Sequence, residues 1–265
     1  HYPAYQPGSN GEFQSSGTAL KATDSSGEYT ESSTINISVF PGKSGEANAK
    51  IDFNSTDNSE SNSSGSAKIL AASGEVDYMY ADQSTAVKAS YKKDDTSKTG
   101  KVTLAMKHAL AMVSFRVYAD HTYKNTGTFT KLVLANKSGG TTILNNGASP
   151  TMKIKDGTIT AGSSPVAVTY TRDIANYMLP KAAADTDQAR TTAKNNARKA
   201  SILVLPESTV DKSTVEATLT IDNQDYKVAL PGSDSKWEAG KNYLYTVKLS
   251  GSELVISSVT VTQWT

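Results

Sequence analysis

The chain has 265 residues, with 27 Lys and Arg against 26 Asp and Glu, and it contains no Cys. A net charge of +1 offers no basic surface for a phosphate backbone, so nucleic acid is excluded as a main partner. Without Cys there is no disulfide framework, thiolate metal site or cysteine nucleophile. The 33 Ser and 31 Thr, about a quarter of the chain, favour strands and turns and suggest an exported protein.

The N-terminal residues 1–17 contain Pro, Gly, Ser and Asn without apolar periodicity, which predicts an extended arm. The start, His1-Tyr-Pro-Ala, lacks the basic and apolar regions of a signal peptide. No window is apolar enough for a membrane-spanning helix. If the protein is exported, we expect its targeting segment to have been removed.

Short segments of apolar side chains recur from residue 35 onward, most of them in alternation with polar ones, as in half-buried strands. They cover residues 35–39, 49–53, 68–71, 76–81, 132–134, 143–144, 152–159, 166–170, 202–205, 215–221, 226–230 and 243–249. Turn residues separate them at even intervals, which is typical of a β-sandwich. The polar tracts 54–66 and 92–100 predict exposed loops.

The apolar pattern changes parity within residues 101–118. Up to Met112 the apolar side chains occupy even positions, and from Val113 onward they occupy odd positions. Because a strand with one buried face keeps its parity, this segment must contain a bulge or pass from one sheet to another.

The parity change predicts a domain boundary. We expect an N-terminal domain of residues 1–106 and a C-terminal domain of residues 107–265. His108 lies on the apolar side of its strand, so we interpret it as a hydrogen-bonded core or interdomain residue. Leu110 and Met112 are assigned to the same region.

Residues 181–199 interrupt the strand pattern. The segment is rich in Ala and other helix formers but has almost no large apolar side chains. It predicts either an exposed helix after Pro180 or a polar loop between two strands, and the sequence does not choose between them.

Catalytic and metal-binding patterns are missing from the sequence. Its three His residues show no metal-ligand spacing, and no Ser lies in a nucleophile elbow. The Gly-Lys-Ser at 42–44 lacks the upstream glycine of a phosphate loop, and residues 57–61 lack the glycine and distal Glu of a calcium loop. We therefore expect no enzyme activity, no metal and no cofactor.

Three stretches occur in order along the chain: residues 76–81 (VDYMYA), residues 102–117 with His108-Ala-Leu-Ala at their centre, and residues 237–247 followed by 259–264. Together they resemble the fimbrillin family, which comprises the type V pilins and their relatives. The resemblance covers residues 76–265, and the first 75 residues match poorly.

The resemblance implies an all-β protein with two transthyretin-like Greek-key β-sandwich domains in series. It also implies export by a lipoprotein route, with a lipid anchor on the precursor, to the outer membrane of a Gram-negative bacterium and into a fimbrium. In this family a protease removes an N-terminal strand, and the C-terminal strand of a neighbouring subunit fills the groove by donor-strand exchange.

The C-terminal residues 254–265 suit such a donor strand, since no charged residue follows Glu253. Apolar side chains recur there in steps of two and three, at Leu254, Ile256, Val259, Val261 and Trp264. A strand of this kind can add to a sheet edge of another copy or a related pilin. Equally, it can be the last strand of its own domain, and one segment can serve both roles at different stages.

We therefore interpret the chain as a structural subunit of cell-surface fimbriae that polymerises head to tail by strand donation and supports adhesion. Its expected partners are other copies of itself or related pilin subunits. The alternative is a monomeric fimbrial tip adhesin or surface lipoprotein that binds a host glycan or matrix protein.

Overall fold

The structure is a computed structural model. It describes residues 13–15, 18–20, 34–42, 50–53, 69–70, 72, 75–81, 105–138, 142–145, 150–154, 156–160, 166–207, 214–230, 236–251 and 253–264. These residues form strands and, within the described part, a single helix, so the predicted all-β class is confirmed. Most of the predicted arm, and the predicted loops 54–66 and 92–100, lie outside the described residues.

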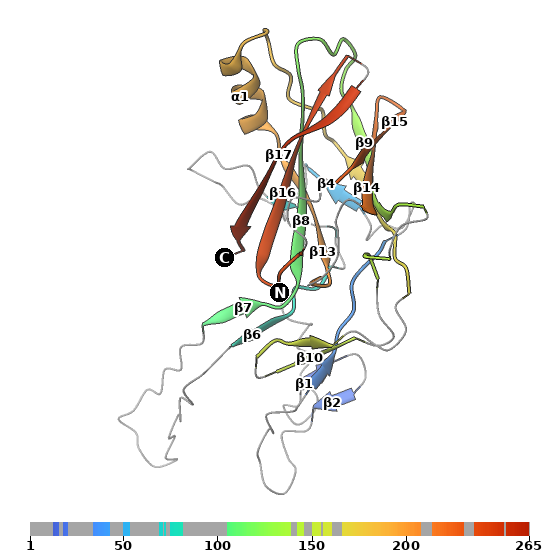
Figure 1. The fold of residues 1–265 in the computed structure, drawn as a ribbon, viewed down its shortest axis with the longest axis vertical. Coiled ribbons are helices and arrows are strands. Elements are labelled where there is room, and N and C mark those ends of the chain that lie inside the picture. The colour runs from blue at the N-terminus through green and yellow to red at the C-terminus, as the bar shows by residue number, and fades with distance from the viewer. Residues whose placement is uncertain are drawn as a thin grey trace, which may run out of the picture.

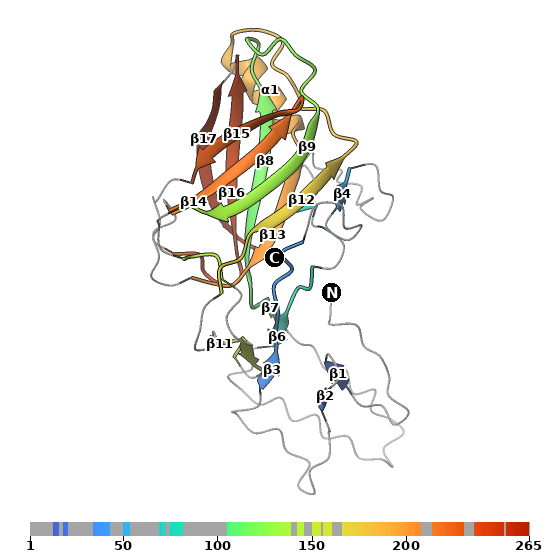
Figure 2. The same ribbon diagram turned by 90° about the vertical axis from the view of Figure 1, so that its right-hand side faces the viewer.

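Two five-stranded sheets pack face to face as a β-sandwich (Figure 2). The first has the order β15 (Gln224–Ala229), β14 (Val215–Ile221), β9 (Phe129–Asn136), β12 (Tyr170–Ala175) and β4 (Lys50–Asp52). The second has the order β17 (Glu253–Gln263), β16 (Lys241–Ser250), β8 (Ala111–Ala119), β13 (Lys199–Val204) and β5 (Ile69–Leu70). Neighbours are antiparallel except for three parallel pairs, β12 with β4, β13 with β5, and β16 with β8.

Smaller sheets lie beyond one end of the sandwich (Figures 1 and 2). One has the order β11 (Ile159–Thr160), β10 (Thr151–Lys153) and β3 (Thr34–Asn36), and the others pair β6 (Met79–Ala81) with β7 (Met106–His108) and β1 (Phe13–Ser15) with β2 (Thr18–Leu20). The predicted run 152–159 is thus a hairpin, with a turn at Gly157, where φ is +70°. Residues 143–144 belong to no strand.

The sandwich core follows from the alternation in the strands. In β14 the side chains of Val215, Ala217, Leu219 and Ile221 are buried, while those between them are partly exposed. Strands β8 and β16 are buried on both faces, which is expected for strands with a neighbour on each side and a covered outer face. Trp237, Phe115 and Tyr245 fill the centre.

The chain passes between two sheets within residues 101–118, a few residues before the parity change at Val113. Strand β7 ends at His108, Ala109 and Leu110 form a bend, and β8 begins at Ala111 in a different sheet. The predicted passage is confirmed, whereas the division into domains at residue 106 stays a prediction. Strands β4 and β5 come from before residue 106, yet they extend both sheets of the sandwich.

Strand β12 is displaced from the predicted position. The sequence predicted a strand at 166–170, whereas the structure has it at Tyr170–Ala175. The cause is Arg172, a charged residue that is completely buried in the middle of the strand and that interrupts the apolar pattern. Its charge is compensated by Glu75, far away in the sequence.

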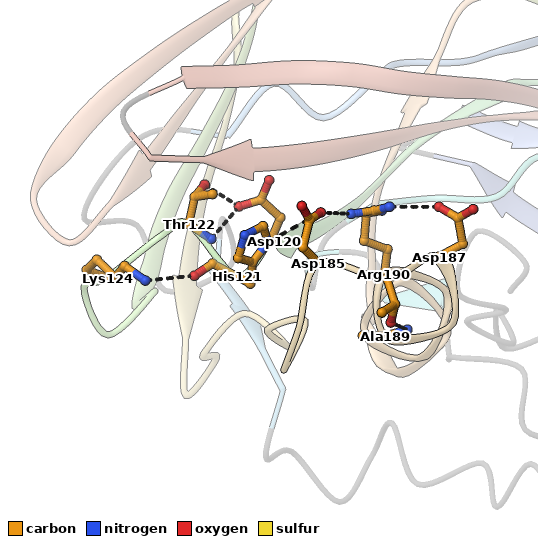
Figure 3. Close-up of polar contacts among 9 residues, drawn as sticks. Asp120, His121, Thr122, Lys124, Asp185, Asp187, Ala189 and Arg190 are labelled. Atoms are coloured by element: carbon orange, nitrogen blue, oxygen red, sulfur yellow. Dashed lines mark hydrogen bonds and ion pairs between the residues drawn. The ribbon is translucent and has the colours of Figure 1, made fainter.

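The segment 181–199 contains a helix, α1 (Asp187–Asn196). Thr186 caps it by accepting a hydrogen bond from the N–H of Ala189 at 3.2 Å. Figure 3 shows Arg190 between Asp185 and Asp187, at 2.5 and 2.7 Å. The few apolar side chains of α1 pack against Tyr118 of β8, so a weakly amphipathic segment still docks on the sheet.

Candidate functional site

Strand β17, the predicted donor segment, is an edge strand. Within the described residues it pairs only with β16, from Glu253 opposite Ser250 to Gln263 opposite Lys241. Figure 1 shows it along the outer side of the sandwich. A long edge strand with no charge after its first residue, Glu253, is a ready template for pairing with another chain. In this structure, then, the segment is the last strand of its own sheet.

The step of three from Ile256 to Val259 comes from a β-bulge. The register with β16 shifts at Ser257, because Ile256 lies opposite Val247 and Ser258 lies opposite Thr246. The extra residue lets the apolar side chains on both sides of it face the same way. A change of step in an apolar pattern is therefore a usable sequence signal for a bulge.

The predicted apolar residues of β17 differ in burial. Leu254 is 8% exposed and belongs to the core, and Ile256, Val259 and Trp264 are half-buried against it. Val261 is 39% exposed, although it lies opposite the fully buried Tyr243. The strand is thus held best at its first half.

Trp264 follows β17 and stacks on His108. The two ring centroids are 3.7 Å apart and the planes differ by 7°. His108 Nδ1–H donates to both carboxylate oxygens of Asp77, at 2.9 and 3.0 Å. The end of the last strand therefore packs on His108, at the end of β7, which Asp77 holds from the segment just before β6.

Backbone hydrogen bonds surround this stack. The N–H of Trp264 donates to the carbonyl of Gly240 at 2.8 Å, and the N–H of Gly240 donates to the carbonyl of Leu110 at 2.9 Å. Gly240 has φ of +70°, and a Cβ there would lie 3.4 Å from the carbonyl oxygen of His108. A glycine thus allows three segments to meet. Leu110 is buried beside the stack, and Met112 is buried in β8 opposite Leu203.

A second junction ties segments from before residue 106 to the sandwich. The guanidinium of Arg172 donates to Glu75 at 2.7 Å and to the carbonyls of Phe40 and Pro41 at 2.8 and 2.7 Å. Glu75 also accepts from the N–H of Leu203 at 3.0 Å. Burial raises the pKa of Glu75, and the charge of Arg172 works against that shift.

A polar depression of about 390 Å³ lies where β8 leads into β9, lined by Asn125, Thr126, Thr128, Thr130, Asp222 and Asn223. The carboxylate of Asp222 accepts hydrogen bonds from the hydroxyl of Tyr123 at 2.7 Å and from the N–H groups of Gly127 and Thr128 at 2.7 and 2.8 Å. Although burial opposes it, these donors lower the pKa of Asp222. The carboxylate is thus used to hold the loops, and the depression offers hydroxyl and amide groups.

Sequence reasoning located β17 and His108 but missed Asp77, Glu75 and Arg172. Asp77 lies within the VDYMYA run, but nothing in the sequence pairs it with a residue 31 positions later. Among the described residues no group of three potential metal ligands gathers, and no helix is long and apolar enough to cross a membrane. What this arrangement offers is strand pairing.

Comparison with known sequences identifies the family. A sequence profile described as fimbrillin-like matches residues 8–264. The chain belongs to the fimbrillin-like family. This fimbrillin-like protein is thus related by sequence to the fimbrillins. A comparison with curated proteins gives no significant match.

Solved structures provide more distant similarities. A protein from Bacteroides uniformis described as a candidate for cell adhesion has a TM-score of 0.43 and 19% identity, over 63% of this chain and 55% of its own. A fimbrial protein from Bacteroides vulgatus has a TM-score of 0.39 and 14% identity, over 64% and 59%. A C-terminally truncated tip fimbrial protein from Porphyromonas gingivalis has a TM-score of 0.34 and 12% identity, over 62% and 55%.

The matched part of the chain therefore spans little more than half of the length of each of these relatives. The assignment to the family rests on the sequence match, which extends over almost the whole chain.

Proposed function

We propose that this fimbrillin-like protein is a structural subunit of a fimbrium and joins other copies, or related subunits, head to tail by donating β17. The observation that carries the proposal is the edge position of β17 together with its lack of charge after Glu253. An edge strand can leave its sheet without breaking a ladder on its other side. Family membership supports the fimbrial setting.

Donation exchanges one set of contacts for another. Leaving β16 breaks a ladder that runs along the full strand and exposes Leu254, whose burial contributes about 1.5–3 kcal/mol. Pairing with the groove of a neighbour restores a ladder, with pockets for alternate side chains that set the register. The net gain depends on how much ordering the new contact requires.

Such an assembly is open-ended. The donor is β17 and the acceptor is a different surface, so the contact is heterologous and generates a filament when the rotation between subunits does not close a ring. Following the family, we place the acceptor groove in the N-terminal half, and the filament on the outer membrane of a Gram-negative bacterium after export of a lipidated precursor.

A competing peptide tests the proposal without altering the chain. Deleting residues 254–265 would also uncover β16, whose buried Tyr243, Tyr245 and Val247 lie opposite β17. A synthetic peptide of residues 253–264 instead competes for the acceptor groove. We expect it to shorten oligomers in native electrophoresis and electron microscopy, while a scrambled peptide of the same composition has no effect. Equal oligomer length with both peptides would contradict strand donation.

The alternative is a tip adhesin or surface lipoprotein that binds a host glycan or matrix protein, and the polar depression near Asp222 favours it. Its hydroxyl and amide groups are suited to hydrogen bonding with sugar hydroxyls. In this case the isolated monomer binds a glycan array, and Asn125→Ala abolishes the signal while oligomers are unaffected. An array without hits would argue against this function.

A further inference from the structure

We infer that Trp264, His108 and Asp77 form a latch that keeps β17 on its own sheet in the free subunit and opens when the strand is donated. This inference rests on the proposed function, because it names what controls the release of the donor strand.

The contact among the three residues has a well-defined geometry. A nearly parallel stack at 3.7 Å places the indole directly on the imidazole, and Asp77 fixes the imidazole plane through two contacts at 2.9 and 3.0 Å. The side chains of His108 and Asp77 are only 13% and 17% exposed. The platform under Trp264 is therefore oriented by its own hydrogen bonds.

The second half of β17 makes few buried contacts with its own sheet. Leu254 is buried, but Val261 is 39% exposed, and Thr262 and Gln263 are exposed. An edge strand with few buried side chains at its end opens locally at small cost. Trp264 is the residue that ties this end down, through its ring and its hydrogen bond to Gly240.

The platform under Trp264 comes from a different sheet than β17. Asp77 lies just before β6 and His108 is the last residue of β7, so both lie in or next to the small two-stranded sheet. Strand β17 belongs to the sandwich. A rearrangement of β6 and β7 would remove the platform from under Trp264. The latch thus couples the part of the chain before residue 108 to the release of the last strand.

Hydrogen exchange on the monomer of residues 1–265 tests the latch. Trp264→Ala removes the stacked ring, and Trp264→Phe is the matched control because it keeps an aromatic ring on His108. We expect exchange at the amides of residues 258–263 to rise about 2- to 13-fold in Trp264→Ala, the factor that corresponds to the loss of one aromatic pair. Exchange in β14 should not change, and Trp264→Phe should behave like the natural chain.

A second variant and an assembly assay complete the test. Asp77→Ala keeps Trp264 but removes the carboxylate that orients His108, so we expect a smaller rise at the same amides. Trp264→Ala should also shorten the lag before oligomers appear. Unchanged exchange at 258–263 in both variants would overturn the latch, as would a rise of equal size in every strand, which indicates general destabilisation.

The failure of the latch and the failure of strand donation give different results. If the competing peptide shortens oligomers but Trp264→Ala alters neither exchange nor lag, donation stands and the latch is wrong. If Trp264→Ala loosens residues 258–263 but the peptide has no effect on oligomers, the docking of β17 by Trp264 stands and its role in assembly is wrong.

Discussion

Replacing Arg172 with Met should destabilise the protein more than any other single charge removal in the described residues. The side chains of Arg172 and Glu75 are 0% and 2% exposed, so the substitution leaves a buried carboxylate without its counter-ion. Breaking a buried ion pair from one side costs about 3–5 kcal/mol. The carbonyls of Phe40 and Pro41 also lose the guanidinium as a donor, and Pro41 keeps only the N–H of Thr171, which places the expected loss at the upper end of that range.

A double-mutant cycle measures this coupling. Glu75→Gln, Arg172→Met and the double variant are compared by urea denaturation, followed by the fluorescence of the buried Trp237. We expect the free energy of unfolding of the double variant to fall by at least about 2 kcal/mol less than the sum of the two single falls. The reason is that the double variant leaves no unpaired charge in the interior. The exposed pair Lys227 and Glu216, at 3.5 Å, is the control and should contribute about 0–1 kcal/mol. A loss below about 1 kcal/mol for Arg172→Met, or additive losses, would refute the reasoning.

Three further changes test other parts of the fold. Partial burial raises the pKa of Glu207 to about 6, so the folded state favours the protonated form, and stability falls as pH rises from about 4.5 through 6. Glu207→Gln should therefore stabilise the protein above pH 6, by about 1 kcal/mol after solvent screening. Urea midpoints that are the same for the variant and the natural chain at both pH 4.5 and pH 7.5 would contradict this expectation. Gly157→Ala should lower the free energy of unfolding by about 1–3 kcal/mol, because φ is +70° and the new Cβ would lie 2.0 Å from the ring of Tyr80. The control is Gly251→Ala, where φ is also positive but the nearest atom to the new Cβ is 4.0 Å away, so thermal unfolding should show a smaller loss. Thr186→Ala should lower the free energy of unfolding by about 1 kcal/mol through loss of the α1 cap, whereas Thr186→Ser should not.

Local patterns were sufficient to predict much of the sandwich from the sequence. The alternation in residues 215–221 is that of a strand with one buried face, and β14 has this burial pattern. The parity change before Val113 pointed to the right segment, since the chain passes between sheets at Ala109 and Leu110, and β8, which follows, is buried on both faces and so shows no single parity. The mixed steps in residues 254–261 likewise correspond to the bulge at Ser257.

Contacts between distant segments could not be predicted in this way. Strand β12 was misplaced because the charge of Arg172 looks like an exposed position until its partner Glu75 is known. The stack of Trp264 on His108 joins residues 156 positions apart, and neither residue type specifies the other. The parallel pairing of β4 with β12 and of β5 with β13 could not be predicted from local patterns either. Only the folded topology brings β4 and β5 to the edges of the sandwich sheets.

A reversible lock on β17 tests the central claim most directly. Leu244 of β16 lies opposite Thr260 of β17, and the chain has no Cys of its own, so Leu244→Cys combined with Thr260→Cys can form only one intramolecular disulfide. The reduced form of the same variant is the control. If β17 is donated, electron microscopy should show filaments from the reduced protein and none from the oxidised protein. Filaments of equal length and number from both forms would contradict strand donation by β17.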